Sequence, residues 1–293
     1  MAISALIRRN KDGSESVVDA IKRSFQSKRE TRPLGSEGWL RVSSLGSICP
    51  REEVLCSVNG VVREEWLDSG TMVNFEFGNA IHWMMQNRVL GEIGMIVGSW
   101  RCTWCGEIYG GRKTGLVCRP ESCAKCGASA YEAKRTNGRP DQLSKDNAFV
   151  FVEEWIGNEE YKIGGSPDGQ YIPCGGSEKD AVLLEFKSCN ERNFYIYKNA
   201  PDFMHAIQAQ LYMWLTGYRK GTIVYVNKNG RLPYGMAEHV LDYDEEVISL
   251  VKSAVNQIRS GIVTKELPAR TVCATYDCSR AAKCVVRDLC FRE

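Results

Sequence analysis

An aspartate in a tight turn and a glutamate–lysine pair on the following apolar segment are the residues best suited to chemistry in this sequence. The stretch "GGSPDGQYIPCGGSEKDAVLLEFKS" places Asp168 in a Pro-Asp-Gly turn and ends an apolar run on Glu185-Phe-Lys187. Taken alone, Pro-Asp-Gly between apolar segments indicates an ordinary turn, because proline presets φ and glycine accepts a positive φ. The second segment raises another interpretation, a metal site.

The pairing of these two segments decides between the interpretations. If residues 169–172 and 181–186 form an antiparallel pair around a symmetric loop, Asp168 faces Glu185 with Cβ atoms roughly 5 Å apart. Facing carboxylates repel each other unless a cation lies between them. Side chains alternate along a strand, so Lys187 shares the face of Glu185. Oxygen ligands suit Mg²⁺ or Mn²⁺, and the pattern therefore predicts metal-assisted hydrolysis of a phosphodiester. A slip of one residue would abolish the site.

Further motifs accompany this hairpin. "SPDG" followed by "LEFK" resembles the motif of the PD-(D/E)xK nucleases, and the stretch from Gly78 to His82 is similar to the Gly-x-x-x-His helix of the RecB-type branch. The stretch from Gln208 to Tyr212 resembles the Gln-x-x-x-Tyr helix of the same branch. The resemblance covers about residues 40–290, apart from a cysteine-rich stretch.

The resemblance implies a role for each of these residues. The implied catalytic set is Asp168, Glu185, Lys187, His82, Gln208 and Tyr212. The two carboxylates and His82 would bind one or two divalent cations, and Lys187 would position the attacking water. Gln208 and Tyr212 would orient the scissile phosphate or the lysine. Alternatively, His82 could be a buried helix histidine, and Gln208 and Tyr212 could be polar packing residues that share a helix face.

Two cysteine pairs predict a structural metal site. "CTWC" and "CAKC" stand seventeen residues apart, a spacing typical of a zinc ribbon with four thiolate ligands. The expected ligands are Cys102, Cys105, Cys123 and Cys126. Cys118 lies between the pairs and could replace one of them. The basic residues around this ribbon indicate either a DNA contact or a solvated surface.

A second cysteine system joins the two ends of the chain. The tail "VCATYDCSRAAKCVVRDLC", taken with the upstream "SICPREEVL", resembles the iron–sulfur subgroup of RecB-like nucleases, which includes the CRISPR-associated exonucleases and the AddB-type helicase–nucleases. The resemblance implies a [4Fe–4S] cluster held by Cys49, Cys273, Cys278 and Cys284. Cys290 is an alternative ligand, because five residues separate Cys284 from Cys278 and also from Cys290. A second Zn²⁺ is the alternative cofactor.

The elements that must position these residues are readable from local patterns. We expect helices over 72–90, ending at Gly91, over 201–217 with Pro201 in the first turn, and over 242–261, ending at Gly261. Ser47 is a candidate N-cap for a helix that begins near Pro50. β-type segments alternate with turns from 148 to 187, and "TIVYVNK" is a buried strand.

Together these elements imply an α/β fold of the PD-(D/E)xK, restriction-endonuclease-like class, with a mixed central sheet flanked by helices. The expected divisions are an N-terminal arm at 1–40, a nuclease core at 41–98 and 136–267, a zinc-ribbon insertion at 99–135, and a cysteine-rich tail at 268–293.

Composition limits the classes of function. The chain has 293 residues, is 43% hydrophobic and carries a net charge of only +2, so a nucleic-acid role needs a local basic groove. No apolar run reaches about 18 residues, and neither a transmembrane helix nor a signal peptide is expected. Thirteen clustered cysteines without a secretory signal indicate metal or iron–sulfur ligation in a reducing cell interior, either the cytoplasm or nucleoid, or a host cytoplasm for a viral protein.

These observations predict a metal-dependent deoxyribonuclease. By the resemblance, it would be an exonuclease on DNA ends or single strands, in recombination or repair, with a recombination or helicase protein as a partner. The alternatives are a structure-specific endonuclease on the same core, a non-catalytic DNA-binding or assembly subunit, and an iron–sulfur redox sensor. The complete Asp168–Glu185–Lys187 set argues against a non-catalytic subunit.

Overall fold

A computed structural model describes residues 39–61, 69–129, 135–136, 139–140, 148–230 and 235–292. The expected N-terminal arm therefore lies outside the described residues, except for its last two positions. None of the helices in the described part of the chain is long and apolar enough to cross a membrane.

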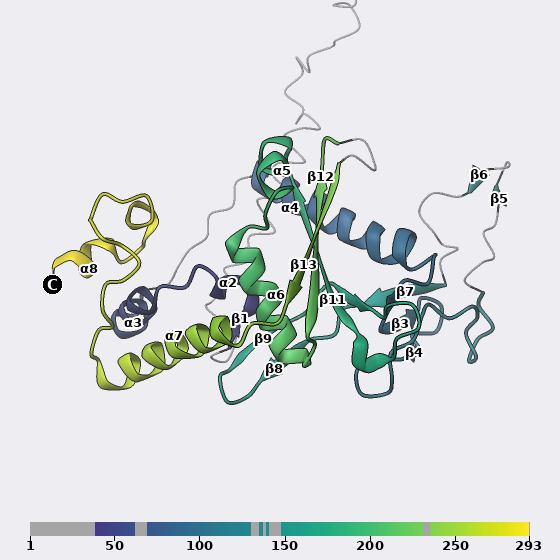
Figure 1. The fold of residues 1–293 in the computed structure, drawn as a ribbon, viewed down its shortest axis with the longest axis horizontal. Coiled ribbons are helices and arrows are strands. Elements are labelled where there is room, and N and C mark those ends of the chain that lie inside the picture. Colours follow the sequence, from purple (N-terminus) through teal and green to yellow (C-terminus); the bar gives the residue numbers. More distant parts are fainter. Residues whose placement is uncertain are drawn as a thin grey trace, which may run out of the picture.

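A five-stranded mixed sheet forms the centre of the structure (Figure 1). Its strand order is β13-β12-β11-β10-β2, and within it only β11 and β12 run parallel. A parallel pair needs a crossover connection, which α5 and α6 provide here. The strands are β2 Ile96–Val97, β10 Gly169–Tyr171, β11 Val182–Cys189, β12 Lys220–Asn227 and β13 Met236–Asp242.

Helices cover both faces of this sheet, as Figure 1 shows for α6 and α4. The large helices are α4 Ser69–Met84, α6 Phe203–Thr216 and α7 Glu245–Thr264, and α7 packs against α6 and α3. Each face of the sheet has its own apolar core, and successive side chains of β11 lie in different cores because side chains alternate along a strand. Leu183 packs with the residues on the α6 side, whereas Leu184 and Phe186 pack with those on the α4 side. The mixed sheet between helices agrees with the expected α/β class.

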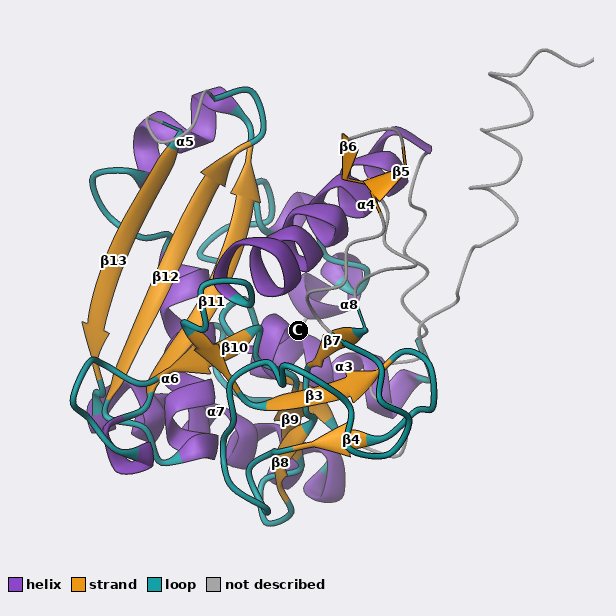
Figure 2. Cartoon of the chain, turned by 90° about the vertical axis from the view of Figure 1, so that its right-hand side faces the viewer, coloured by secondary structure: helices purple, strands orange, loops and turns teal. Residues whose placement is uncertain are grey.

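Smaller sheets lie beside the central one (Figure 2). One combines β1 Leu40–Arg41, β9 Ile163–Gly165 and β8 Ile156–Asn158. Another combines β4 Ile108–Tyr109, β3 Ser99–Cys102 and β7 Phe149–Val152, and a two-stranded ribbon joins β5 Arg135–Thr136 to β6 Arg139–Pro140. Because β3 pairs with β7, the cysteine-rich stretch is tied to the strand that follows it.

The remaining elements are short. They are α2 Val42–Leu45, α3 Pro50–Asn59, the π-helix η3 Met85–Leu90, the 3₁₀ turns η4 Glu178–Asp180 and η5 Ala281–Lys283, α5 Glu191–Tyr197 and α8 Arg287–Arg292. The tail with η5 and α8 folds back on α3, where Leu55, Val286 and Cys290 form a small apolar cluster.

Three predicted helix boundaries are wrong. The N-cap of α3 is Cys49 rather than Ser47, and α6 begins after Asp202, whose side chain accepts a hydrogen bond from the Met204 N–H, so Pro201 precedes the helix. Helix α7 continues through Gly261 to Thr264. Gly261 is needed for close packing, since a Cβ there would lie 2.7 Å from Val54 Cγ2.

The helix expected over 72–90 is present but changes character. It is α-helical to Met84 and a π-helix from Met85 to Leu90, followed by Gly91 as predicted. The wider turn directs two successive side chains, Gln86 and Asn87, into the protein, where both are buried.

Candidate functional site

The hairpin of β10 and β11 brings the two motif carboxylates to one place. Gly169 pairs with Leu184, so Asp168 follows opposite Glu185, immediately beyond the last pair of the ladder. This is the register assumed in the sequence analysis. Asp168 Oδ2 accepts a hydrogen bond of 2.6 Å from the Phe186 N–H, which fixes the aspartate to the neighbouring strand.

A hydrogen-bonded trio holds the other motif residues. Lys187 Nζ donates to Glu185 Oε1 at 2.7 Å and to Gln208 Oε1 at 3.0 Å. Gln208 Nε2 donates to the same Glu185 oxygen at 2.6 Å. Glu185 and Lys187 share a face of β11, whereas Phe186 points into the opposite core. The trio therefore positions the lysine ammonium beside the carboxylates.

The second oxygen of Glu185 has no partner among the described residues. Glu185 is 2% exposed, and its Oε2 atom is buried without a hydrogen bond. Burial, and then the charge of Asp168, raise the pKa of Glu185 from 4.5 to about 7. Burial opposes the charge of Lys187, but the carboxylates of Glu185 and Asp168 keep the pKa of the lysine above its ordinary value. An unpaired buried carboxylate oxygen is unfavourable, which indicates that a ligand completes this site.

Helix α4 brings His82 to the same carboxylates. Its Nδ1 lies 3.1 Å from Asp168 Oδ1. Burial opposes protonation, but the hydrogen bond to Asp168 and the charge of that residue raise the pKa of His82. Gly78, one turn earlier, lets the helix approach β11, since a Cβ there would lie 3.3 Å from Ser188 Oγ. The spacing of Gly78 and His82 thus reflects close packing followed by a polar contact.

The structure adds a residue that the sequence analysis missed, Glu153. One ligand atom each of His82, Glu153 and Asp168 lie within 4.8 Å of one another, whereas Glu185 is outside this tight group. Gln86 Nε2 donates to Glu153 Oε1 at 2.7 Å and to the Asp168 carbonyl at 2.8 Å. Burial of its carboxylate raises the pKa of Glu153. The sequence feature that could have indicated Glu153 is its position directly after the apolar strand β7.

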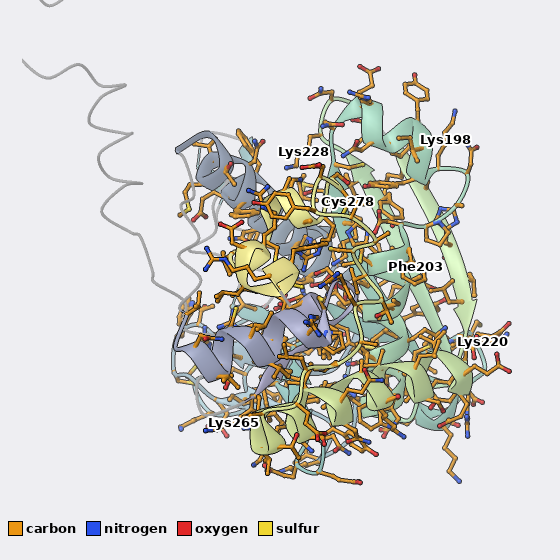
Figure 3. All side chains as sticks on the ribbon, turned by 90° about the vertical axis from the view of Figure 1, so that its left-hand side faces the viewer. Lys198, Phe203, Lys220, Lys228, Lys265 and Cys278 are labelled. Atoms are coloured by element: carbon orange, nitrogen blue, oxygen red, sulfur yellow. The ribbon has the colours of Figure 1, made fainter. Side chains whose placement is uncertain are left out.

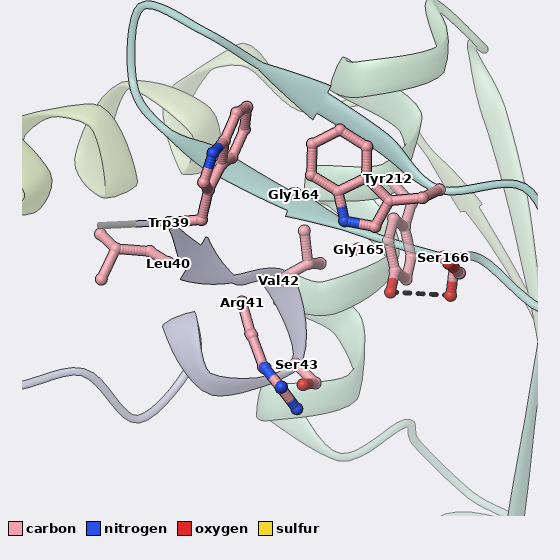
Figure 4. A pocket seen from close by; sticks show the side chains of 10 residues that line it. Trp39, Leu40, Arg41, Val42, Ser43, Gly164, Gly165, Ser166 and Tyr212 are labelled. Carbon is pink, nitrogen blue, oxygen red and sulfur yellow. Dashed lines mark hydrogen bonds between the residues drawn. The ribbon is translucent and has the colours of Figure 1, made fainter. Parts of the chain in front are cut away.

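Tyr212 lies behind the turn rather than among the carboxylates. Its hydroxyl donates to the Ser166 carbonyl at 3.0 Å (Figure 4). Gly165 makes this possible, because a Cβ there would lie 2.8 Å from the tyrosine oxygen. Of the two predicted residues on α6, Gln208 contacts the charged residues and Tyr212 supports the turn that carries Asp168.

The donor set suits a hard divalent cation. Carboxylate oxygens of Asp168, Glu185 and Glu153, with the His82 imidazole beside them, match the preference of Mg²⁺ and Mn²⁺ for oxygen ligands. A cation would also offset the mutual repulsion of these carboxylates. The arrangement can therefore support metal-assisted attack on a phosphate ester.

The predicted ribbon cysteines form a second group. The sulfurs of Cys102, Cys105, Cys123 and Cys126 all lie within 4.8 Å of one another. Cys102 and Cys126 are 3.7 Å apart and Cys105 and Cys123 are 3.5 Å apart, close to the ~3.8 Å edge of a tetrahedron with Zn–S bonds of about 2.3 Å.

Of two nearby residues, Tyr109 contacts this group of cysteines and Cys118 does not. The Tyr109 hydroxyl is 3.1 Å from Cys123 Sγ, and this hydrogen bond lowers the pKa of Cys123 to about 6. Cys118 is exposed, and its thiol contacts the Gly94 carbonyl instead of the group. Cys118 thus stays outside the group of four, in which the pKa of Cys123 is lowered and the pKa values of Cys105 and Cys126 are raised.

The tail cysteines meet Cys49 at the opposite end of the molecule. Cys49, Cys273, Cys284 and Cys290 line one small cavity together with four arginines, of which Arg280 forms an ion pair with Glu52. Burial raises the pKa of Cys49 and of Cys284 despite the nearby arginines. Burial, and then the neighbouring Cys278, labelled on the tail in Figure 3, raise the pKa of Cys273 to about 11. Among the described residues, these sulfurs do not form a group as tight as that of the ribbon cysteines.

Comparisons with known proteins give likeness in structure alone. No protein-family model and no curated protein matches the chain. The structure of SSO0001 is 14% identical, with coverage of 94% of this chain and 96% of its own and a TM-score of 0.42. The alkaline exonuclease LHK-Exo from Laribacter hongkongensis is 13% identical, with coverage of 83% and 93% and a TM-score of 0.41.

A phage-related exonuclease from Haemophilus somnus 129PT is also similar. It is 13% identical, with coverage of 78% of this chain and 94% of its own and a TM-score of 0.37. Two of these three structures are of exonucleases.

Proposed function

We propose that the chain is a divalent-cation-dependent deoxyribonuclease that hydrolyses phosphodiesters at a DNA end or in single-stranded DNA. The buried, unpartnered Oε2 atom of Glu185 carries this proposal. Glu185 lies opposite Asp168 across the β10–β11 hairpin, and one ligand atom each of Asp168, His82 and Glu153 lie within 4.8 Å of one another. Buried polar atoms without a partner are uncommon in folded proteins, and a bound cation would give this oxygen of Glu185 a partner.

Each residue of the site has a proposed role. Asp168, Glu185 and His82 would hold the cation, and Glu153 is available as a further ligand. When bound, the cation would supply Lewis-acid stabilisation of the charge that develops on the phosphate. The Lys187 ammonium, held by Glu185 and Gln208, would position the attacking water through a hydrogen bond. Gln86 would keep the Glu153 carboxylate and the Asp168 backbone at a constant separation.

Cleavage of end-labelled single-stranded DNA in Mn²⁺ tests this function. Asp168→Asn keeps the side-chain shape and should lower the rate by on the order of 100-fold or more, the size expected when one electrostatic stabiliser is removed. Asp242→Asn, at an exposed position on β13, should cut at the wild-type rate. Full activity of the Asp168 variant, with the same circular dichroism as wild type, would remove the proposed site.

The mode of attack needs a separate substrate. We propose exonuclease action in recombination or repair, alongside a helicase or another recombination protein. Circular single strands, which have no ends, should then stay intact under conditions that degrade the linear strand. Their digestion would instead assign a structure-specific endonuclease to the same core.

We also propose two cysteine-held cofactors. Cys102, Cys105, Cys123 and Cys126 would bind a structural Zn²⁺, supported by their near-tetrahedral spacing. Cys49, Cys273 and Cys284, with either Cys278 or Cys290, would hold a [4Fe–4S] cluster. Iron and sulfide analysis of anaerobically purified protein, with visible absorption, tests the cluster. Zinc in its place would assign a second Zn²⁺ site.

A further inference from the structure

A cavity of about 500 Å³ opens beside the turn that carries Asp168 (Figure 4). Trp39 and Arg41 line it from the β1 segment, Trp155 from the residue before β8, and Ser166 from the end of β9. We call it the tryptophan pocket. Its volume falls within the roughly 300–1,000 Å³ of small-ligand sites. None of the residues proposed to hold the cation or the attacking water lines it, although Tyr212, Gly165 and Ser166, which support the Asp168 turn, do.

The pocket is adjacent to the carboxylate centre. Ser166 lies two residues before Asp168, and a chain advances at most about 3.6 Å per residue, so the two Cα atoms are within about 7 Å of each other. The Tyr212 hydroxyl holds the Ser166 carbonyl at 3.0 Å. A nucleotide in the pocket could therefore place its neighbouring phosphodiester at the carboxylates.

Two tryptophans form the walls of the pocket. Their rings meet edge to face, with centroids 4.8 Å apart. Trp155 rests on backbone, because a Cβ at either Gly157 or Gly164 would overlap its ring. Despite this support, Trp155 is 58% exposed. A large aromatic ring that is braced from below and open to solvent is the arrangement that stacks nucleobases in single-strand binding proteins.

The charges of the pocket favour an anionic ligand. None of its ten lining residues is acidic, although the carboxylate centre of Asp168, Glu185 and Glu153 is adjacent to it. Arg41 lines the pocket and is exposed, and Lys162 Nζ, which is ion-paired with Glu159, is 5.0 Å from the centroid of the Trp39 ring. Lys162 has φ 46°, an uncommon conformation for lysine, and its carbonyl accepts a 2.7 Å hydrogen bond from the Leu40 N–H. An aromatic, negatively charged ligand fits both the exposed tryptophan ring and the absence of acidic residues from the lining.

We propose that the tryptophan pocket binds an unpaired nucleobase of the DNA strand, one nucleotide from the phosphodiester that is cut, by stacking on Trp155. This inference rests on the proposed nuclease function and specifies its substrate. A paired base cannot enter without leaving its duplex stack, so the pocket selects single-stranded or frayed ends. Loss of one base–aromatic stack corresponds to roughly 5- to 150-fold in affinity.

Binding without cleavage isolates this pocket. Fluorescence anisotropy without Mg²⁺ or Mn²⁺ would compare a labelled single strand with an abasic strand of equal length and charge. Trp155→Ala should weaken binding of the normal strand by roughly 5- to 150-fold and leave binding of the abasic strand unchanged. Trp104→Ala is the matched control, since Trp104 is 68% exposed on the cysteine ribbon, and it should change neither.

Each outcome decides the proposal. Equal weakening of both strands by Trp155→Ala, or no weakening, would overturn it. Trp155→Phe keeps a stacking ring and should retain base-dependent binding, which excludes a folding defect as the cause. Asp168→Asn should abolish cutting but not this binding. If it does so while Trp155→Ala has no effect, the nuclease function stands and only the pocket assignment fails.

Discussion

Glu185→Gln is expected to abolish cleavage and, at the same time, to stabilise the fold. Burial and the charge of Asp168 raise the pKa of Glu185 from 4.5 to about 7. The folded state thus binds a proton that the unfolded state releases, and ionisation of Glu185 removes stability as the pH rises from about 4.5 to about 7. At about 1.4 kcal/mol per pH unit, the total is about 3 kcal/mol, most of it between pH 5 and 8. Glutamine cannot ionise and avoids this loss.

Urea unfolding at a series of pH values measures the effect. In buffer without added Mg²⁺ or Mn²⁺, the unfolding free energy of Glu185→Gln minus that of wild type should increase by about 2–3 kcal/mol from pH 5 to pH 8. Glu238→Gln, at an exposed position of β13, should show a constant difference. Added Mn²⁺ should stabilise wild type more than Glu185→Gln. A difference that stays constant for Glu185→Gln, or that decreases as the pH rises, would refute this reasoning.

Three further changes test other parts of the structure. Burial lowers the pKa of His205 to about 4, so the stability that its neutral form contributes is complete above pH 6.5 and is lost as the pH falls towards 4. In urea unfolding, the free energy of unfolding of His205→Gln should therefore gain about 1–2 kcal/mol over that of wild type across this window, after allowance for solvent screening. A difference that stays constant with pH would contradict this. Cys123→Ser should lose about one zinc per chain by metal analysis, whereas Cys118→Ser should keep it, and equal zinc contents would contradict the ribbon assignment. Gln86→Ala should raise the Mn²⁺ concentration for half-maximal cleavage by about 10- to 100-fold, with the rate recovered at saturating Mn²⁺; a loss that Mn²⁺ cannot recover would place Gln86 elsewhere in the reaction.

The hairpin was predictable because its information is local. The loop between β10 and β11 is symmetric, and alternation along a strand assigns Glu185 and Phe186 to opposite faces. The spacing of the four ribbon cysteines likewise reflects one small unit, and their sulfurs lie together. The contact of His82 with Asp168 spans a longer range, and only the resemblance to a known helix motif indicated it.

Other features depend on contacts between distant segments. Glu153 reaches the site because β7 pairs with β3, whose sequence position gives no sign of this partner. Gly261 has the local character of a helix end, but its lack of a side chain serves packing against Val54, and the helix continues to Thr264. Local propensity competes here with tertiary packing, and packing decides the boundary.

The π-helical segment after His82 behaves as if one spare residue had been inserted into an α-helix. Gln86 donates to the Glu153 carboxylate, and its neighbour Asn87 accepts a 2.7 Å hydrogen bond from the Phe151 N–H, so two successive residues of this segment contact β7 or the residue after it. Shortening Met85–Leu90 by one residue would therefore leave the histidine in place on its own helix. The contacts of Gln86 and Asn87 with β7 and Glu153 would be lost instead, and the centre would lose its support for the Glu153 carboxylate while every motif residue stayed in the sequence.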